Sequence, residues 1–321
     1  MLVLIEPAIA MLRDETQERS AAVARAESHP DPWARAMLHL MISISAENDG
    51  DIATVEQHMP LSLALFHEVG DRWGIGSASG PLSNIWSARG EVERAITALQ
   101  EARQLMIELH STEDESYSLI RIGVLRMRLG DQEGARRDVE AGLEIARTIG
   151  SVLSVSSGML ALAAIAHGDG QTDEARQLSE AALAMVERTA NTPGQIRAVA
   201  HCALAGLDIA AGDLEAAGAH LVASHEAVLE TRDMPVAAVL ALALAEFRLA
   251  QGDPRTAAKL LGAAVAVRGM EDVSDLEVKR VEAATRAALS PPEYDRSRAE
   301  GRTLPRAAAL ALIETALPPS P

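Results

Sequence analysis

The sequence predicts an all-α fold, an α-solenoid of about six helix pairs that repeat every 40 residues. Hydrophobic residues make up 48% of the 321 residues but aromatics only 2%. The apolar content is therefore mainly Ala and Leu, which favour helix over strand. Glycines recur at nearly constant intervals of 40, 40, 40, 42 and 40 residues, at Gly50, Gly90, Gly130, Gly170, Gly212 and Gly252. In such an array each unit packs on its neighbours, so a long chain needs no single large core.

Other positions keep the same register and define the unit as an α-hairpin. The second repeat shows it: Leu82 and Ser83 stand eight and seven residues before Gly90, and Ala95 stands five after it. Small residues let two helices cross closely, and large aliphatics fill the space beside them. The glycine ends the first helix with a positive φ. The acidic residue after it, such as Glu91, begins the second helix as its N-cap or first-turn anion.

Each helix is expected to run about seventeen residues, or roughly 25 Å at 1.5 Å per residue. The second helices are expected to end near Gly70, His110, Gly150, Ala190, Arg232 and Gly269.

The same pattern divides the chain into four parts. Residues 1–30 are predicted to form N-terminal capping helices, and Asp31 followed by Pro32 marks a helix start. The repeat array is expected over residues 31–270, arranged as a right-handed superhelix. Residues 271–317 are expected to form the C-terminal capping helices that repeat arrays need. Residues 318–321 are expected to be a frayed tail.

The motif resembles the tetratricopeptide repeat, in which a large residue and a small one precede Gly-Asp-x-x-x-Ala. The unit here is lengthened from 34 to 40 residues. Segments such as 71–74, 257–264 and 300–307 are similar to the C-terminal tetratricopeptide region of actinobacterial large transcriptional regulators. That group includes the Streptomyces antibiotic regulatory proteins and the LuxR-type ATP-binding regulators. The resemblance implies a regulatory context, with the DNA-binding and nucleotide-binding domains outside this sequence.

The net charge of −17 disfavours direct nucleic acid binding by this chain, because a negative surface repels phosphate backbones. The single cysteine, Cys202, permits no intrachain disulfide, which fits a cytoplasmic location. The apolar start lacks the basic residues of a signal peptide. The longest apolar runs are too short for a bilayer, so no membrane association is expected.

Searches for reactive motifs indicate a protein that is not an enzyme. Neither lysine follows a glycine, which excludes a phosphate-binding Gly-Lys-Ser/Thr loop. Residues 76–80 place Ala78 where a nucleophile elbow needs serine. The histidines have no zinc-ligand spacing, and Cys202 is expected to be a buried structural thiol. No catalytic residue, metal or cofactor is predicted.

The resemblance also implies which residues line the concave groove of the superhelix. Its groove positions, counted back from each repeat glycine, include Asn84, Tyr117, Met127, Arg128, His167 and Glu246. The clamp that captures peptide carboxylates needs a repeated set of Lys, Asn and Arg, and only Asn84 and Arg128 resemble it. The small apolar groove positions of the later repeats suit an amphipathic helix better. Alternatively, the long first helices pack on one another and close the groove.

These observations favour a protein-interaction and sensing scaffold of a bacterial transcriptional regulator. The expected partner is a protein or peptide, either an amphipathic helix or a regulator domain, bound along the concave face; a homodimer is also compatible. One alternative is a small-molecule receptor whose groove holds a hydrophobic metabolite. A second is an enzyme with a site grafted onto the helical scaffold.

Overall fold

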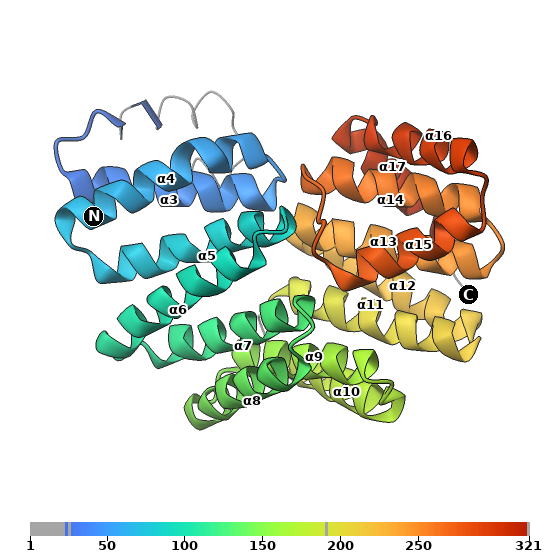
Figure 1. Ribbon diagram of the computed structural model, residues 1–321, viewed down its shortest axis with the longest axis horizontal. Helices are drawn as coiled ribbons and strands as arrows, with labels where there is room; N and C mark the ends of the chain where they lie inside the picture. Colours follow the sequence, from blue (N-terminus) through green and yellow to red (C-terminus); the bar gives the residue numbers. More distant parts are fainter. Residues whose placement is uncertain (1–22, 25–26, 190–191, 320–321) are drawn as a thin grey trace.

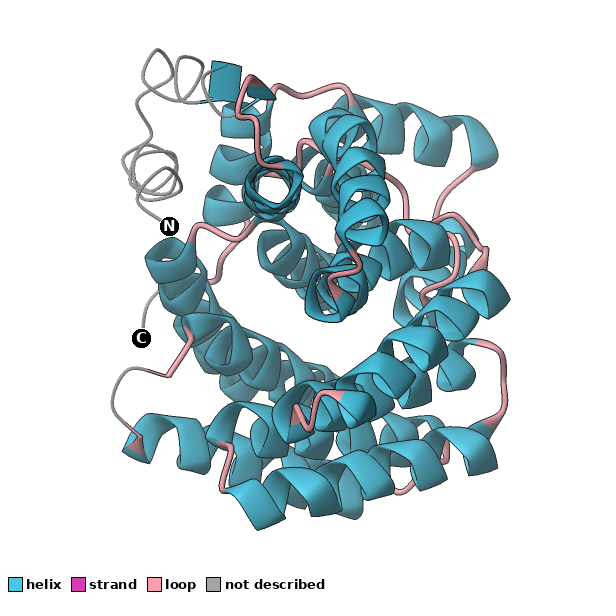
Figure 2. Ribbon diagram, turned by 90° about the vertical axis from the view of Figure 1, so that its left-hand side faces the viewer, coloured by secondary structure: helices cyan, strands magenta, loops and turns pink. Residues whose placement is uncertain are grey.

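The computed structural model describes residues 23–24, 27–189 and 192–319. These contain helices joined by short loops and no strand (Figure 2). Six of the helices are the first members of pairs: α3 (Pro32–Asn48), α5 (Arg72–Ala88), α7 (Thr112–Arg128), α9 (Val152–Gly168), α11 (Gly194–Ala211) and α13 (Met234–Ala250). Their partners are α4 (Ile52–Val69), α6 (Val92–Glu108), α8 (Gln132–Ile149), α10 (Thr172–Arg188), α12 (Leu214–Thr231) and α14 (Pro254–Arg268).

Three shorter helices follow the six pairs. They are α15 (Leu276–Ala287), α16 (Pro291–Arg302) and α17 (Arg306–Thr315). All three contact α14, and α15 and α17 also contact α13. Most of the segment expected to cap the N-terminus, residues 1–22 and 25–26, lies outside the described residues, as do residues 320 and 321 of the tail.

The helix ends follow the repeat glycines. All six repeat glycines have a positive φ, between 66° at Gly50 and 87° at Gly90. After the glycine, Asp51, Asp131, Asp213 and Asp253 each cap the next helix and accept a backbone N–H three residues on. Such a cap satisfies one of the donors that a helix start leaves unpaired. The expected hairpin geometry is confirmed.

Small residues at the crossings let the two helices of a pair approach closely. A Cβ atom at Gly123 of α7 would lie 2.4 Å from Val139 and 2.7 Å from the Ala135 carbonyl oxygen of α8. Serines also tie the pairs together: Ser62 donates to the Ala36 carbonyl at 2.8 Å. Ser224 makes the equivalent bond to Ala198 at 3.0 Å.

The first helices form the inner layer of the array. Neighbouring first helices contact one another, as α3 does α5 and α7 does α9. The second helices from α4 to α12 each pack between two first helices, and α14 packs between α13 and α16. The chain runs from α3 and α4 on one side of the molecule, through α7–α10 at the bottom, to α13–α17 on the other side (Figure 1).

The two ends of this path meet. Gly50, after α3, lies so close to Gly269, after α14, that a Cβ atom on Gly269 would be 2.0 Å from the Gly50 carbonyl oxygen. The Val273 amide donates to the Ala88 carbonyl oxygen at the end of α5, at 2.8 Å. The array is therefore closed on itself. Residues Gly269–Asp275, between α14 and α15, make this closing contact and are called the closing segment below.

The expected all-α array of six pairs is confirmed, and the fold is a tetratricopeptide-like helical repeat. Within the described residues, no helix combines the length and apolar character needed to cross a lipid bilayer.

Candidate functional site

The candidate site is the inner face, the side of the first helices that lies toward the closing segment. On α7 it includes Tyr117, Arg121, Val124 and Arg128, which share one side because three or four residues span one helical turn.

At the N-terminal part of the inner face, three polar side chains from three helices are linked. Asn84 of α5 donates to Oε1 of Glu47 on α3 at 2.6 Å. Arg121 of α7 donates to the Asn84 side-chain oxygen at 2.5 Å and to the Gly80 carbonyl at 2.9 Å. The first three repeats thus present one fixed donor and acceptor network, called the Glu47–Asn84–Arg121 network below.

Large exposed side chains flank this network. Tyr117 is 44% exposed, and its ring lies 5.6 Å from the Arg121 guanidinium carbon. Ile44, one turn from Glu47 on α3, is also 44% exposed. An aromatic ring and an aliphatic side chain beside oriented polar groups are typical of protein-binding surfaces.

Arg128, in contrast, is engaged by the chain itself. Its guanidinium lies 3.2 Å from Asp272 and 3.0 Å from Asp275, both in the closing segment. It also donates to the hydroxyls of Ser87 and Ser274. Burial alone would raise the pKa of Asp272. The charges of Arg128 and Arg268 lower it, as do hydrogen bonds from Ser274, and the pKa of Asp272 is below its usual value. This ion pair joins α7 to the C-terminal part of the array.

His167 and Glu246 lie on the other side of the inner face. Glu246 of α13 is 16% exposed and accepts from Arg280 of α15 at 2.6 Å. Burial raises the pKa of Glu246, and the charges of Arg280 and of nearby His167 offset this only in part. Among the described residues, Nδ1 of His167 has no hydrogen-bond partner. Met127 is partly buried against the core between α7 and α10.

The sequence-predicted residues therefore fall into separate groups. Asn84 and Tyr117 lie near one another through Arg121, and Glu246 lies near His167, while Arg128 belongs to the closing contact. Sequence reasoning missed Arg121 and Arg280. Arg121 stands one helical turn from Tyr117 on the same side of α7, which was a usable signal. Arg280 lies in α15, after the last repeat, so counting from a repeat glycine gives no position for it.

A cavity of about 200 Å³ lies at the C-terminal part, between α13, α14, α15 and α16. Its wall combines aliphatic side chains such as Leu242 and Leu261 with charged ones such as Arg268 and Glu282.

The structure tests the expectation made for the single cysteine, Cys202. Cys202 is buried, its sulfur lies 3.1 Å from the Ser224 hydroxyl oxygen, and burial raises the pKa of the thiol to about 11. Such a thiol is not poised as a nucleophile. The expectation that this thiol is buried is confirmed.

Comparison with solved structures places the fold among helical-repeat proteins. RapI in its apo form matches with a TM-score of 0.61 and 13% identity, over 87% of this chain and 98% of that chain. The apo quorum sensor NprR from B. thuringiensis has a TM-score of 0.48 and 12% identity, over 98% of both chains. A signal transduction ATPase (STAND) protein with a tetratricopeptide repeat sensor from Pyrococcus horikoshii matches with a TM-score of 0.48 and 12% identity. The match covers 91% of this chain and 43% of that chain.

At 13% identity, the similarity between this chain and RapI concerns the fold alone. No protein-family model and no curated protein sequence matches the chain.

Proposed function

We propose that this chain is a protein-interaction and sensing scaffold that binds a peptide segment of a partner protein on its inner face. The observation that carries the proposal is the exposed pair Tyr117 and Ile44 beside the Glu47–Asn84–Arg121 network. The two large side chains offer apolar contact area, and the network offers donors and acceptors whose positions are already fixed. A fixed network spares a ligand part of the ordering cost of binding.

The closing segment supports a peptide as the class of ligand. It is a non-helical stretch of chain that lies on the same face, with a carboxylate of Asp272 on Arg128 and the Val273 amide on the Ala88 carbonyl oxygen. The inner face thus already holds one peptide segment through side-chain and main-chain hydrogen bonds. A partner segment would use the same kinds of contact at Asn84, about one helical turn from Ala88, and at Tyr117, about three turns from Arg128.

We further propose that the scaffold serves a bacterial transcriptional regulator. The resemblance of the repeats to the C-terminal region of actinobacterial regulators supports this context. The net charge of −17 supports a division of labour in which other domains contact DNA and this chain contacts protein.

The test is selection of a displayed random peptide library on the purified chain, followed by calorimetry with the enriched peptides. Replacement of Tyr117 by Ala should weaken their binding at least tenfold, since a central aromatic contact contributes on the order of 2 kcal/mol. Leu229→Ala is the matched control, because Leu229 is 63% exposed but lies on α12, a second helix outside the inner layer. That variant should bind as the unchanged chain does.

Two outcomes would count against the proposal. One is failure to enrich any peptide. The other is equal binding of the enriched peptides by the Tyr117→Ala and Leu229→Ala variants. Thermal stabilisation by a hydrophobic metabolite, without peptide binding, would instead support the small-molecule receptor.

A further inference from the structure

Two histidines face each other inside the first helix pair. Nδ1 of His39 on α3 lies 2.8 Å from Nδ1 of His58 on α4, and the ring centroids are 5.0 Å apart. The side chains are buried, with residue exposures of 6% and 8%. At this separation one ring donates its Nδ1–H to the bare Nδ1 of the other, so the accepting ring is neutral. Burial, the largest cause, lowers the pKa of both histidines below the usual 6.5.

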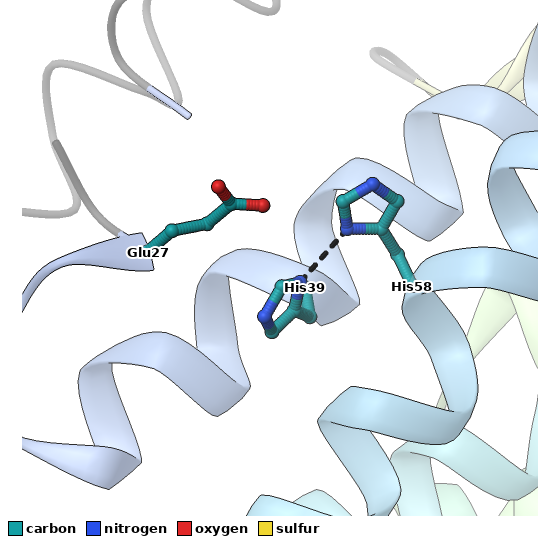
Figure 3. Close-up of side chains that lie close together, drawn as sticks. All are labelled: Glu27, His39 and His58. Atoms are coloured by element: carbon teal, nitrogen blue, oxygen red, sulfur yellow. Dashed lines mark hydrogen bonds between the residues drawn. The ribbon is translucent and has the colours of Figure 1, made fainter. Parts of the chain in front are cut away.

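A carboxylate completes a group of three. Glu27, which precedes α3, is directed toward the two rings (Figure 3). A carboxylate oxygen of Glu27 and one ring nitrogen of each histidine lie within 4.8 Å of one another. Three atoms bound to one Zn²⁺ ion at its usual bond lengths are roughly 3.3 Å apart. Glu27 is exposed, so its side chain is free to move the remaining distance.

The surroundings of the group are open and include acidic side chains. A cavity of about 410 Å³ reaches it and is lined by Glu27 and His58 together with Asp49 and Asp51. Among the described residues, Arg35 is close enough to His39 to lower its pKa further. An ion can therefore enter from solvent, and the nearby carboxylates attract it.

A second histidine pair provides an internal comparison. His201 and His220 stand eleven residues before and eight after Gly212, as His39 and His58 do around Gly50. Their Nδ1 atoms are 3.0 Å apart and their rings 5.2 Å apart. The described part of the chain offers no third ligand within 4.8 Å of both rings.

The nearest acid to the second pair is already engaged. Asp208 lies 3.7 Å from the other ring nitrogen of His220 and is paired with Arg176 at 2.6 Å. The repeat thus places a histidine pair at the same two positions twice, and within the described residues a third ligand lies beside the first pair and not beside the second.

We propose that Glu27, His39 and His58 form a binding site for a Zn²⁺ ion. Two imidazoles and a carboxylate are a donor set that zinc prefers, and three protein ligands leave one tetrahedral position for water from the cavity. When the ion binds, the ring that donates through Nδ1 carries its proton on Nε2 instead, so the two histidines lose no net proton. The ion then takes the place of the hydrogen bond between the two Nδ1 atoms. The bound ion would tie the segment carrying Glu27 to α3 and α4.

The experiment is calorimetric titration of the full chain with Zn²⁺ after treatment with a chelator, supported by the visible spectrum with Co²⁺. We expect one Zn²⁺ per chain and the absorption bands of tetrahedral Co²⁺. Glu27→Gln should weaken Zn²⁺ binding at least about tenfold, because it removes one of three ligands. His58→Asn should abolish it, while keeping a side chain that can hydrogen-bond to Nδ1 of His39. His220→Asn, at the equivalent position of the second pair, should leave binding unchanged.

The proposal fails if the chain takes up no Zn²⁺ at concentrations up to about 100 µM, far above those that structural sites need. It also fails if Glu27→Gln and His58→Asn bind as the unchanged chain does, or if His220→Asn is the variant that loses the ion. Thermal melting of each variant without metal reports on folding. Should His58→Asn not fold, the exposed Glu27→Gln substitution alone decides the question.

Discussion

At the scale of single residues, the paired histidines are the least expected feature of the molecule. The equivalent positions of the other four repeats hold no histidine: they are Ser79 and Ala98, Leu119 and Asp138, Met159 and Leu178, and Ala241 and Leu260. His201 shows the consequence most clearly: burial, the adjacent His220 and then Arg197 lower its pKa from 6.5 to about 4. Burial also lowers the pKa of His220, against the opposing charges of Asp208 and Glu180. The His201 ring is therefore neutral in the folded chain well below neutral pH.

This predicts a loss of stability in mild acid. Between pH 6.5 and 4 the unfolded chain protonates His201 and the folded chain does not, so the free energy of unfolding falls as the pH falls. The loss should be on the order of 1–2 kcal/mol by pH 4.5, allowing for solvent near a partly exposed pair. Urea unfolding at pH 7.5 and 4.5 measures it.

The matched variant is His201→Asn, which removes the titrating ring but keeps a hydrogen-bonding group toward His220. Its stability should depend less on pH in this window than that of the unchanged chain. Between pH 7.5 and 8.5 the free energy of unfolding should change with pH equally in the variant and the unchanged chain, because neither the folded nor the unfolded state binds a proton at His201 there. An equal loss in acid for both proteins would contradict the assignment.

The sequence suggests residues of the inner face but not their partners. The resemblance to the tetratricopeptide repeat implies that Asn84, Tyr117 and Arg128 lie on the inner side of their helices. The acids that engage Arg128 come from 144 and 147 residues away in a loop with no repeat register. The histidine pairs span two helices, so a search for local zinc spacing passes over them. Contacts that depend on how the array closes cannot be found from one repeat alone.

At the scale of helices, the glycines have two different functions. Those between helices take positive φ, which only glycine adopts without strain. Gly123 instead lies inside α7 and permits close contact with α8. Gly206 lies inside α11 in open space, where the nearest atom to an added Cβ would be Oε2 of Glu246 at 3.8 Å.

Two glycine-to-alanine substitutions should therefore change stability in opposite directions. Gly123→Ala should destabilise the chain by about 1–3 kcal/mol, because the new methyl group would overlap the Ala135 carbonyl and Val139. Gly206→Ala should stabilise it by about 0.5–1 kcal/mol, because alanine favours helix and meets no obstacle. Chemical unfolding of the two variants measures both effects. A stabilising Gly123→Ala would mean that α7 and α8 can separate at little cost.

Helix boundaries were the most predictable feature of the fold. Asp caps and positive-φ glycines are local signals, and the structure has helix ends at these positions. Three second helices end without a glycine: α10 ends at Arg188, whereas α6 and α12 are followed by residues with positive φ, 56° at His110 and 52° at Arg232. Only alignment with the other repeats indicates a helix end at His110 and Arg232, because positive φ is uncommon for residues other than glycine.

At the scale of the whole molecule, closure of the array decides what the inner face can bind. An open superhelix exposes its inner helices along their full length. Here the closing segment occupies the ends of α5 and α7, and the ion pair of Arg128 with Asp272 and Asp275 is the polar centre of that contact. The side chains of Arg128 and Asp272 are 15% and 3% exposed. Removing one partner from such a buried pair leaves the other charge without compensation.

Replacement of Arg128 by Ala should therefore open the array. The free energy of unfolding should fall by about 3 kcal/mol. The radius of gyration from small-angle X-ray scattering should rise, and the Val273 amide should exchange its hydrogen faster as it leaves the Ala88 carbonyl oxygen. The control is Arg126→Ala: Arg126 also pairs with two acids, Asp131 and Asp138, but both belong to its own helix pair. That variant should keep the radius of gyration and the protection of Val273. If Arg128→Ala kept both as well, the glycine contact between Gly50 and Gly269 would be sufficient to hold the array closed.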